Sequence, residues 1–96
     1  MAIAQFPSFS SVAKFAATVS LDVSSIPATS RATETFTVAG LRAGSMIPIV
    51  HMPSLDAGLT LVNARITANN TLELTIDNNT GGAINQAAQN VEILGL

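Results

Sequence analysis

The chain contains a single histidine, His51, and this residue is the first to consider as a catalytic or metal-binding group. A histidine base must lie within hydrogen-bond reach of the proton it takes, and a metal site needs several ligands at defined spacing. No Ser-His-Asp or Cys-His arrangement accompanies His51, and its nearby candidate partner is Asp56 in the MPSLDAG segment. The pattern favours a polar residue at the end of a strand over a catalytic base.

Two further segments carry groups that bind ions in other proteins. Asp77-Asn78-Asn79 offers oxygen ligands, of which calcium takes about six to eight, but no alternating acidic loop is present and the next carboxylate is Glu92. Gly40–Ser45 (GLRAGS) has the glycines of a phosphate-binding loop but lacks the Gly-Lys-Ser/Thr ending and opens no helix. Both segments are interpreted as turns, for which Asn and Gly supply the backbone geometry.

The acidic side chains do not form a paired acid and base. The six carboxylates are spread singly along the chain, at Asp22, Glu34, Asp56, Glu73, Asp77 and Glu92. The sequence has no cysteine, and so no thiolate nucleophile, disulfide or cysteine-based zinc site. We therefore predict a protein that is not an enzyme, with no catalytic residues, no bound metal and no cofactor.

The elements that position these groups are strands, and the strongest of them form a hairpin over Leu59–Gly82. Apolar and polar residues alternate in both of its strands, which is the period of a strand with one buried face. The expected inward residues are Val62, Ala64 and Ile66 in the first strand and Leu72, Leu74 and Ile76 in the second. Between them lies Ala68-Asn69-Asn70, and asparagine tolerates the positive φ of a tight hairpin turn.

Four more strands are expected outside the hairpin, at Ala17–Ser24, Thr33–Ala39, Met46–His51 and Asn90–Leu96. Pro48 removes a backbone donor, so the strand that contains it belongs at a sheet edge or a bulge. No segment predicts a helix longer than a turn or two. The sequence therefore predicts an all-β fold, a small antiparallel β-sandwich or barrel of about six to seven strands.

The composition excludes some partners and favours others. The net charge is −2, the four basic residues are scattered and Trp and Tyr are absent, so we expect no nucleic-acid partner. No apolar stretch approaches the ~18 residues of a membrane span, and no secretory signal is present, so we expect no membrane partner. Charged residues make up 10% of the chain, against roughly 25% in an average domain. A surface so low in charge favours association, and we expect a homo-oligomer.

The N-terminal segment differs from the rest of the chain. Residues 1–15 hold three of the four phenylalanines and are expected to form an N-terminal arm, with residues 16–96 forming the β-sandwich domain. Apolar residues recur there with period three, which fits neither a strand nor a long α-helix. We predict that the arm binds a neighbouring subunit through Phe6, Phe9, Val12 and Phe15. The alternative is that these side chains cap the domain's own core.

Residues 33–84 resemble a β module of small structural proteins of tailed bacteriophages. The matching patterns are T-x-T-F-T-V-x-G-L-x-A-G, then A-G-L-x-[LI]-V-N-A-R-[IV]-[TS]-A, and then T-L-E-[LI]-T-x-x-N-x-[TA]-x-x-A-I. With the preceding Ala17–Thr33 the resemblance covers about two thirds of the chain, and it carries no catalytic residues. The resemblance implies a component of the virion, such as a head decoration or cement protein, a head fibre or a tail accessory.

The residues and the resemblance together lead to one expected function. It is that of a structural virion protein, located on the capsid surface or tail, which decorates or cements the capsid shell. Its expected partners are further copies of itself and the major capsid protein or another virion protein. The alternatives are a tail or head-fibre component and a receptor- or carbohydrate-binding module. Against the last stands the lack of Trp and Tyr, which commonly supply sugar-stacking surfaces.

Overall fold

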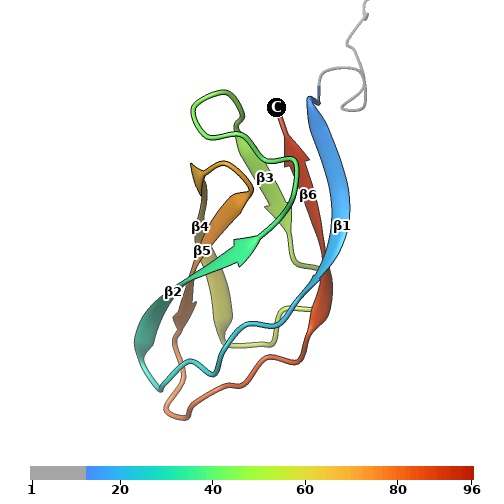
Figure 1. Cartoon of the computed structure of the whole chain (residues 1–96). Coiled ribbons are helices and arrows are strands. Elements are labelled where there is room, and N and C mark those ends of the chain that lie inside the picture. Colours follow the sequence, from blue (N-terminus) through green and yellow to red (C-terminus); the bar gives the residue numbers. More distant parts are fainter. Residues whose placement is uncertain (1–12) are drawn as a thin grey trace, which may run out of the picture.

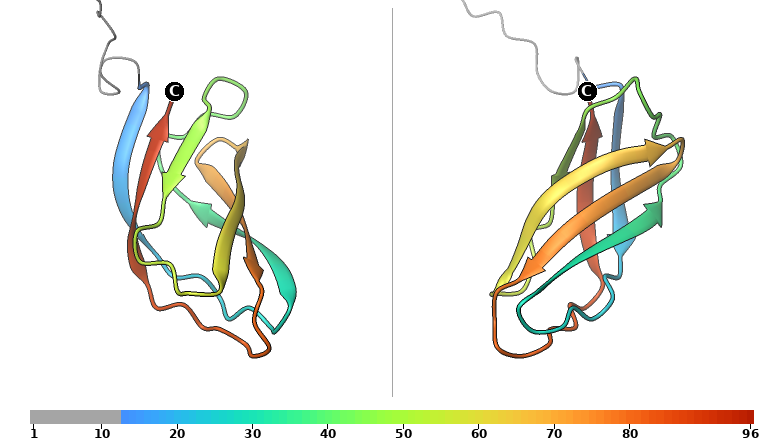
Figure 2. Two further views of the ribbon diagram at one scale, coloured as in Figure 1. Left: turned by 180° about the vertical axis from the view of Figure 1, so that it is seen from behind. Right: turned by 90° about the vertical axis from the view of Figure 1, so that its left-hand side faces the viewer.

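Strands of the expected alternating pattern pair into two antiparallel sheets in a computed structural model, which describes residues 13–96. The strands are β1 (Phe15–Leu21), β2 (Ser30–Thr37), β3 (Pro48–His51), β4 (Leu59–Ala68), β5 (Thr71–Asn78) and β6 (Gln89–Gly95). One sheet has the order β1-β6-β3 and the other the order β2-β5-β4. The sheets form two layers whose strands cross at an angle (Figures 1 and 2). The all-β sandwich prediction is confirmed, with six strands and no helix in the described residues.

The predicted hairpin is the pair β4–β5, and its turn has the expected conformation. Asn70 lies at φ 64°, in the left-handed region that asparagine enters more readily than most residues. The turn also holds the neighbouring loop, because the Asn70 Oδ1 accepts a 2.9 Å hydrogen bond from the Gly40 N–H and the Asn69 Oδ1 accepts one of 3.0 Å from the Ala43 N–H. The two asparagines thus fix both their own turn and the Gly40–Ser45 loop.

One residue of the hairpin faces the opposite way from the prediction. Val62 was expected to point inward with Ala64 and Ile66, but its side chain is 43% exposed. The register of β4 against β5 shifts between Leu61 and Asn63, so a β-bulge interrupts the alternation. Leu61 packs on the core in its place, and the prediction for Val62 is wrong.

The ends of the other strands shift by a few residues from their predicted bounds. β1 begins at Phe15 and ends at Leu21, although Val23 and Ile26 beyond it are still buried. β3 is a short edge strand that starts at Pro48, so the predicted position of this proline at a sheet edge is confirmed. Its ring occupies the first residue of the strand, where a missing backbone donor disturbs the pairing least.

The core fills the space between the two sheets. The fully buried side chains alternate along the two central strands, at Leu72, Leu74 and Ile76 in β5 and at Val91 and Ile93 in β6. Central strands bury their inward side chains completely because both neighbours flank them, whereas Ala17 and Val19 of the edge strand β1 remain partly accessible. The predicted burial of Leu74 is confirmed, at 0% exposure.

Buried amide side chains close the end of the sandwich opposite the hairpin turn. Asn78 donates from Nδ2 to the carbonyls of Ile26 (3.0 Å) and Gly82 (2.9 Å), and its Oδ1 accepts from the Thr80 N–H and hydroxyl (2.9 and 2.7 Å). Gln86 spans to the 52–58 loop, where its Oε1 accepts from the Asp56 N–H at 2.6 Å. These loops therefore hold their shape through side-chain hydrogen bonds rather than through strand pairing.

Candidate functional site

An open groove of about 500 Å³ lies on the outer face of the β1-β6-β3 sheet. Its floor is made of two rows of side chains that the strand register sets side by side. Ala16, Leu94 and Ile49 form an apolar row across β1, β6 and β3. Thr18, Glu92 and His51 form a polar row next to it. We call these six residues the groove rows.

The apolar row lies in solvent in the isolated chain. Ile49 is 39% exposed, and Ile47, which precedes the strand and pairs with Leu96 through two 2.9 Å backbone hydrogen bonds, is 67% exposed. Single exposed aliphatic residues are ordinary on protein surfaces, but neighbouring ones that line a groove are typical of contact surfaces. The groove rows are therefore suited to bind another macromolecular surface.

The histidine predicted to be a polar strand-end residue ends β3, and its neighbour is a carboxylate that the sequence did not indicate. His51 Nε2 lies 4.0 Å from Glu92 Oε1, and both side chains are well exposed. The antiparallel register places Glu92 directly opposite His51, while Asp56 lies in the following loop, where its N–H binds Gln86. His51 and Asp56 are thus not brought together.

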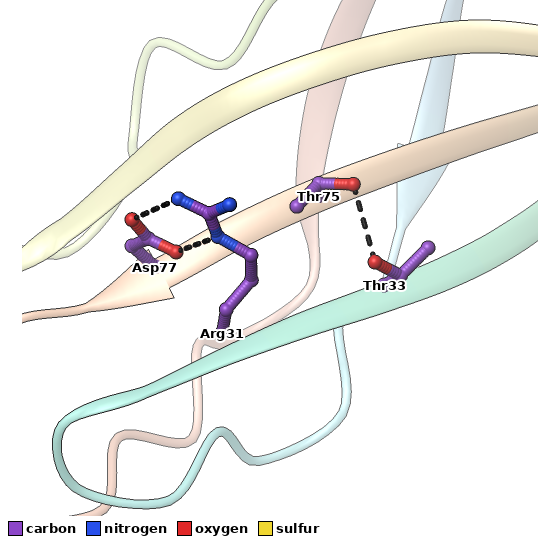
Figure 3. A network of polar contacts seen from close by, with 4 residues as sticks. All are labelled: Arg31, Thr33, Thr75 and Asp77. Carbon is purple, nitrogen blue, oxygen red and sulfur yellow. Dashed lines mark hydrogen bonds and ion pairs between the residues drawn. The ribbon is translucent and has the colours of Figure 1, made fainter.

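Asp77, the one carboxylate of the Asp77-Asn78-Asn79 segment, is engaged in an ion pair (Figure 3). Arg31 binds it in a bidentate manner, with Nε–Oδ1 at 2.6 Å and Nη2–Oδ2 at 3.0 Å. The hydrogen bond from Arg31, together with the positive charge, holds the pKa of Asp77 below its usual value. Among residues 13–96, no group of three or more His, Cys, Asp or Glu side chains could hold a metal ion.

The glycine loop uses its amides internally. Gly40 lies at φ 103°, and the N–H groups of Gly40 and Ala43 are bound by the side-chain oxygens of Asn70 and Asn69. Gly40 also packs against Phe15, because a Cβ added there would lie 2.6 Å from the phenylalanine ring. The loop is thus a packed turn.

The structure describes one of the four predicted partner-binding residues. Phe15 is the first residue of β1, half-buried, and packs on the domain's own core. Lys14 before it is also tied to the domain, through its N–H to the Gly95 carbonyl at 2.7 Å and its Nζ to the Ser45 carbonyl at 2.6 Å. Phe6, Phe9 and Val12 lie outside the described residues, and their role in partner binding stays a prediction.

The groove rows were missed at the sequence level, although a local signal exists for them. An apolar residue directly after another in a strand must point to the opposite face, because successive side chains alternate. Ile93-Leu94 and Ile49-Val50 are such pairs, and in each pair one residue is buried or packs on the core while the other lines the groove. Ala16-Ala17 is a third such pair, so a search for consecutive apolar residues would have found all three members of the apolar row.

Comparisons of this chain with protein-family models, with curated proteins and with solved structures found no match. The bacteriophage resemblance therefore rests on the residue patterns quoted above, and the site is interpreted from its own geometry.

Proposed function

We propose that this protein is a structural bacteriophage virion protein that decorates or cements the capsid shell through subunit contacts. The observation that supports the proposal is the outer face of the β1-β6-β3 sheet, where an uncharged apolar row lines an open groove. The resemblance of residues 33–84 to a module of bacteriophage structural proteins is the reason for proposing a bacteriophage particle.

The chemistry of the groove rows suits a protein partner of low charge. Covering accessible aliphatic side chains removes apolar area from water, which contributes about 25 cal/mol per Å². Thr18, Glu92 and His51 beside them can exchange hydrogen bonds with the partner's backbone or polar side chains, which provides orientation. A small domain with such a face is useful when many copies bind one repeating surface, as on a shell of capsid protein.

The division of the chain between scaffold and contact face also supports the proposal. The module-like residues 33–84 contain β3, β4, β5 and most of β2, while β1 and β6 lie outside them. Two of the three strands that carry the groove rows thus lie outside residues 33–84.

The proposal is tested by counting copies of the protein in purified particles of the virus that encodes it, using quantitative mass spectrometry against the major capsid protein. Hundreds of copies per particle are expected for a shell component. A few copies, or some dozens, would instead assign the protein to the tail or a head fibre. Complete absence from particles would overturn the virion role.

A further inference from the structure

The four edges of the two sheets differ in how well they are protected against pairing with another strand. β3 is four residues long and begins with Pro48, β4 contains two register shifts, and β2 carries Arg31 and Glu34. β3 and β4 also lie against each other at one side of the sandwich. Charges, prolines, bulges and covered edges are the features by which natural sheets avoid unwanted pairing.

β1 has none of these features. Its seven residues, FAATVSL, include no charge and no proline, and its register with β6 continues without a shift from Phe15 to Leu21. Within residues 13–96 it is paired on one side alone, with β6 in the middle of the sheet (Figure 2). No strand of residues 13–96 pairs with the backbone groups on its other side, to which a further strand could bind.

The sequence around β1 is self-complementary in the antiparallel direction. If a second copy of β1 pairs with the first about a two-fold axis through Thr18, Thr18 faces its own equivalent and Ala16 faces Ser20 of the second copy. Lys14 then faces Asp22 of the second copy, and the symmetry repeats this contact of opposite charges. All five of these residues are exposed; Ala16, Thr18 and Ser20 lie on the outer side of β1, and Lys14 and Asp22 flank its two ends.

The inner side of the strand matches in the same register. Phe15 faces Leu21 of the second copy and Ala17 faces Val19, so apolar residues meet apolar residues. In the single chain Phe15, Ala17 and Val19 are only half-buried, and a strand added at this edge would cover them further. Lys14 Nζ donates to the Ser45 carbonyl, and an ammonium group has two further protons available for the carboxylate.

From the unprotected edge and the matching charges we infer that two copies of this chain associate through antiparallel pairing of β1. The pairing produces one continuous six-stranded sheet with the order β3-β6-β1-β1-β6-β3. The polar row His51–Glu92–Thr18 then continues through the second Thr18 into its counterpart, so the outer faces of the two copies form a single surface. The inference deepens the proposed assembly role and rests on it for its purpose, because a paired face would offer a shell two grooves at once.

The first experiment measures the association of the purified full-length chain by sedimentation velocity. We expect a dimer at about 100 µM that dissociates on dilution, since a single strand edge makes a small interface. Thr18→Lys sets two like charges opposite each other at the two-fold axis and should weaken the dimer about tenfold. The matched control is Thr35→Lys on the β2 edge, which should leave association unchanged.

The second experiment tests the register, and the absence of cysteine from the chain makes its result unambiguous. Thr18→Cys should form a disulfide-linked dimer under mild oxidation, because residues directly opposite lie about 4.5–5.5 Å apart between Cα atoms, within reach of a disulfide. Ala16→Cys, on the same face of the same strand, should not link to itself. A mixture of Ala16→Cys and Ser20→Cys chains should link to one another.

A full chain that stays monomeric, with no linking of Thr18→Cys, would overturn the inference, and this is also the outcome if the chain's own residues 1–12 occupy the edge. Self-linking of Ala16→Cys in place of Thr18→Cys would overturn the register and the Lys14–Asp22 contact. If Thr35→Lys weakened the dimer and Thr18→Lys did not, the interface would lie at β2, and the inference would be overturned as well. None of these results bears on the count of copies in virions, so the failure of one proposal is distinguishable from the failure of the other.

Discussion

The two sheets of the sandwich have outer faces of different chemistry. On the β2-β5-β4 sheet, cross-strand partners meet as polar pairs. Figure 3 shows Arg31 with Asp77 and Thr33 with Thr75 at 3.2 Å. Arg65 pairs with Glu73 at 2.8 Å in the same way. On the β1-β6-β3 sheet the corresponding positions carry the groove rows, with small or aliphatic side chains and a contact between His51 Nε2 and Glu92 Oε1 at 4.0 Å.

This difference indicates which of the two outer faces can be buried against a partner at the lower desolvation cost. A side chain already paired with its cross-strand neighbour gains little from a partner protein, and desolvating an ion pair is costly. Burying the apolar row of Ala16, Leu94 and Ile49 carries no cost of this kind, because these side chains have no polar group to desolvate. The outer face of the β2-β5-β4 sheet is therefore suited to solvent and that of the β1-β6-β3 sheet to contact. Substitutions in the β2-β5-β4 sheet should accordingly affect mainly the stability of the fold, and substitutions in the groove rows should affect mainly assembly.

The largest effect on stability is expected at the centre of the β2-β5-β4 sheet. Leu74→Ala empties a fully buried site on β5 and should lower the free energy of unfolding by about 2–5 kcal/mol. Leu94→Ala makes the same change on the outer face of β6 and should cost about 1 kcal/mol or less. Urea denaturation of the purified chains measures both values. Equal losses would contradict the assignment of inner and outer faces.

A somewhat smaller loss is expected at Asn78, which joins the end of β5 to the loops. Asn78→Ala removes two donors and an acceptor from buried carbonyl and amide groups, and unsatisfied groups of this kind cost about 1–3 kcal/mol. Asn79→Ala changes the exposed neighbour and serves as the control. Thermal unfolding should show a clear shift for the first variant alone. If both variants unfold at the same temperature as the wild type, the hydrogen bonds of the buried Asn78 amide do not stabilise the loops.

The Arg31–Asp77 pair should make a small, pH-dependent contribution. Because the pKa of Asp77 is lower in the folded chain than its unfolded value near 3.9, the pair stabilises the fold above that value. This contribution is lost as the pH falls through the folded pKa. Arg31→Gln should therefore lower the melting temperature at pH 7, and this effect should be smaller at about pH 2, because protonation of Asp77 weakens the pair.

The control for this pair is Arg42→Gln, which removes an exposed arginine from the Gly40–Ser45 loop. Its effect on the melting temperature should be the same at both pH values. A pH-independent effect of Arg31→Gln would mean that the arginine acts through packing rather than through its charge. The outer faces of the two sheets would then differ less in their electrostatic interactions than the geometry of the polar pairs indicates.

The smallest effect on stability is expected in the groove, where the effect on assembly should be largest. Ile49→Glu places a charge in the apolar row and should change the free energy of unfolding by no more than about 0.5 kcal/mol, as is usual for surface sites. Under the proposed virion role, retention of the protein on virus particles should nevertheless be lost. Thr60→Glu, on the outer side of β4, is the control that should be retained. Retention of both variants would show that the groove is not the contact face.

Local sequence was sufficient to predict the strands and several details within them. Period-two alternation identified the β4–β5 hairpin and the burial of Leu74, because side-chain direction along a strand follows directly from backbone geometry. The positive φ of Asn70 and the edge position of Pro48 followed from the backbone preferences of those two residue types. These features depend on neighbours in the chain, which a sequence contains.

Tertiary structure alone decided which residues meet across the two sheets. The pairing of β1 with β6 brings residues from opposite ends of the chain together and sets Thr18 beside Glu92. The pairing of β3 with β6 sets His51 on the other side of Glu92, which completes the polar row of the groove. The bulge at Val62 likewise arises from the fit of β4 against β5. Alternation in the sequence predicts that a residue points outward, but it does not predict which residues lie beside it. The neighbours of a residue across a sheet depend on strand order and register, and these are set by the packing of the whole core.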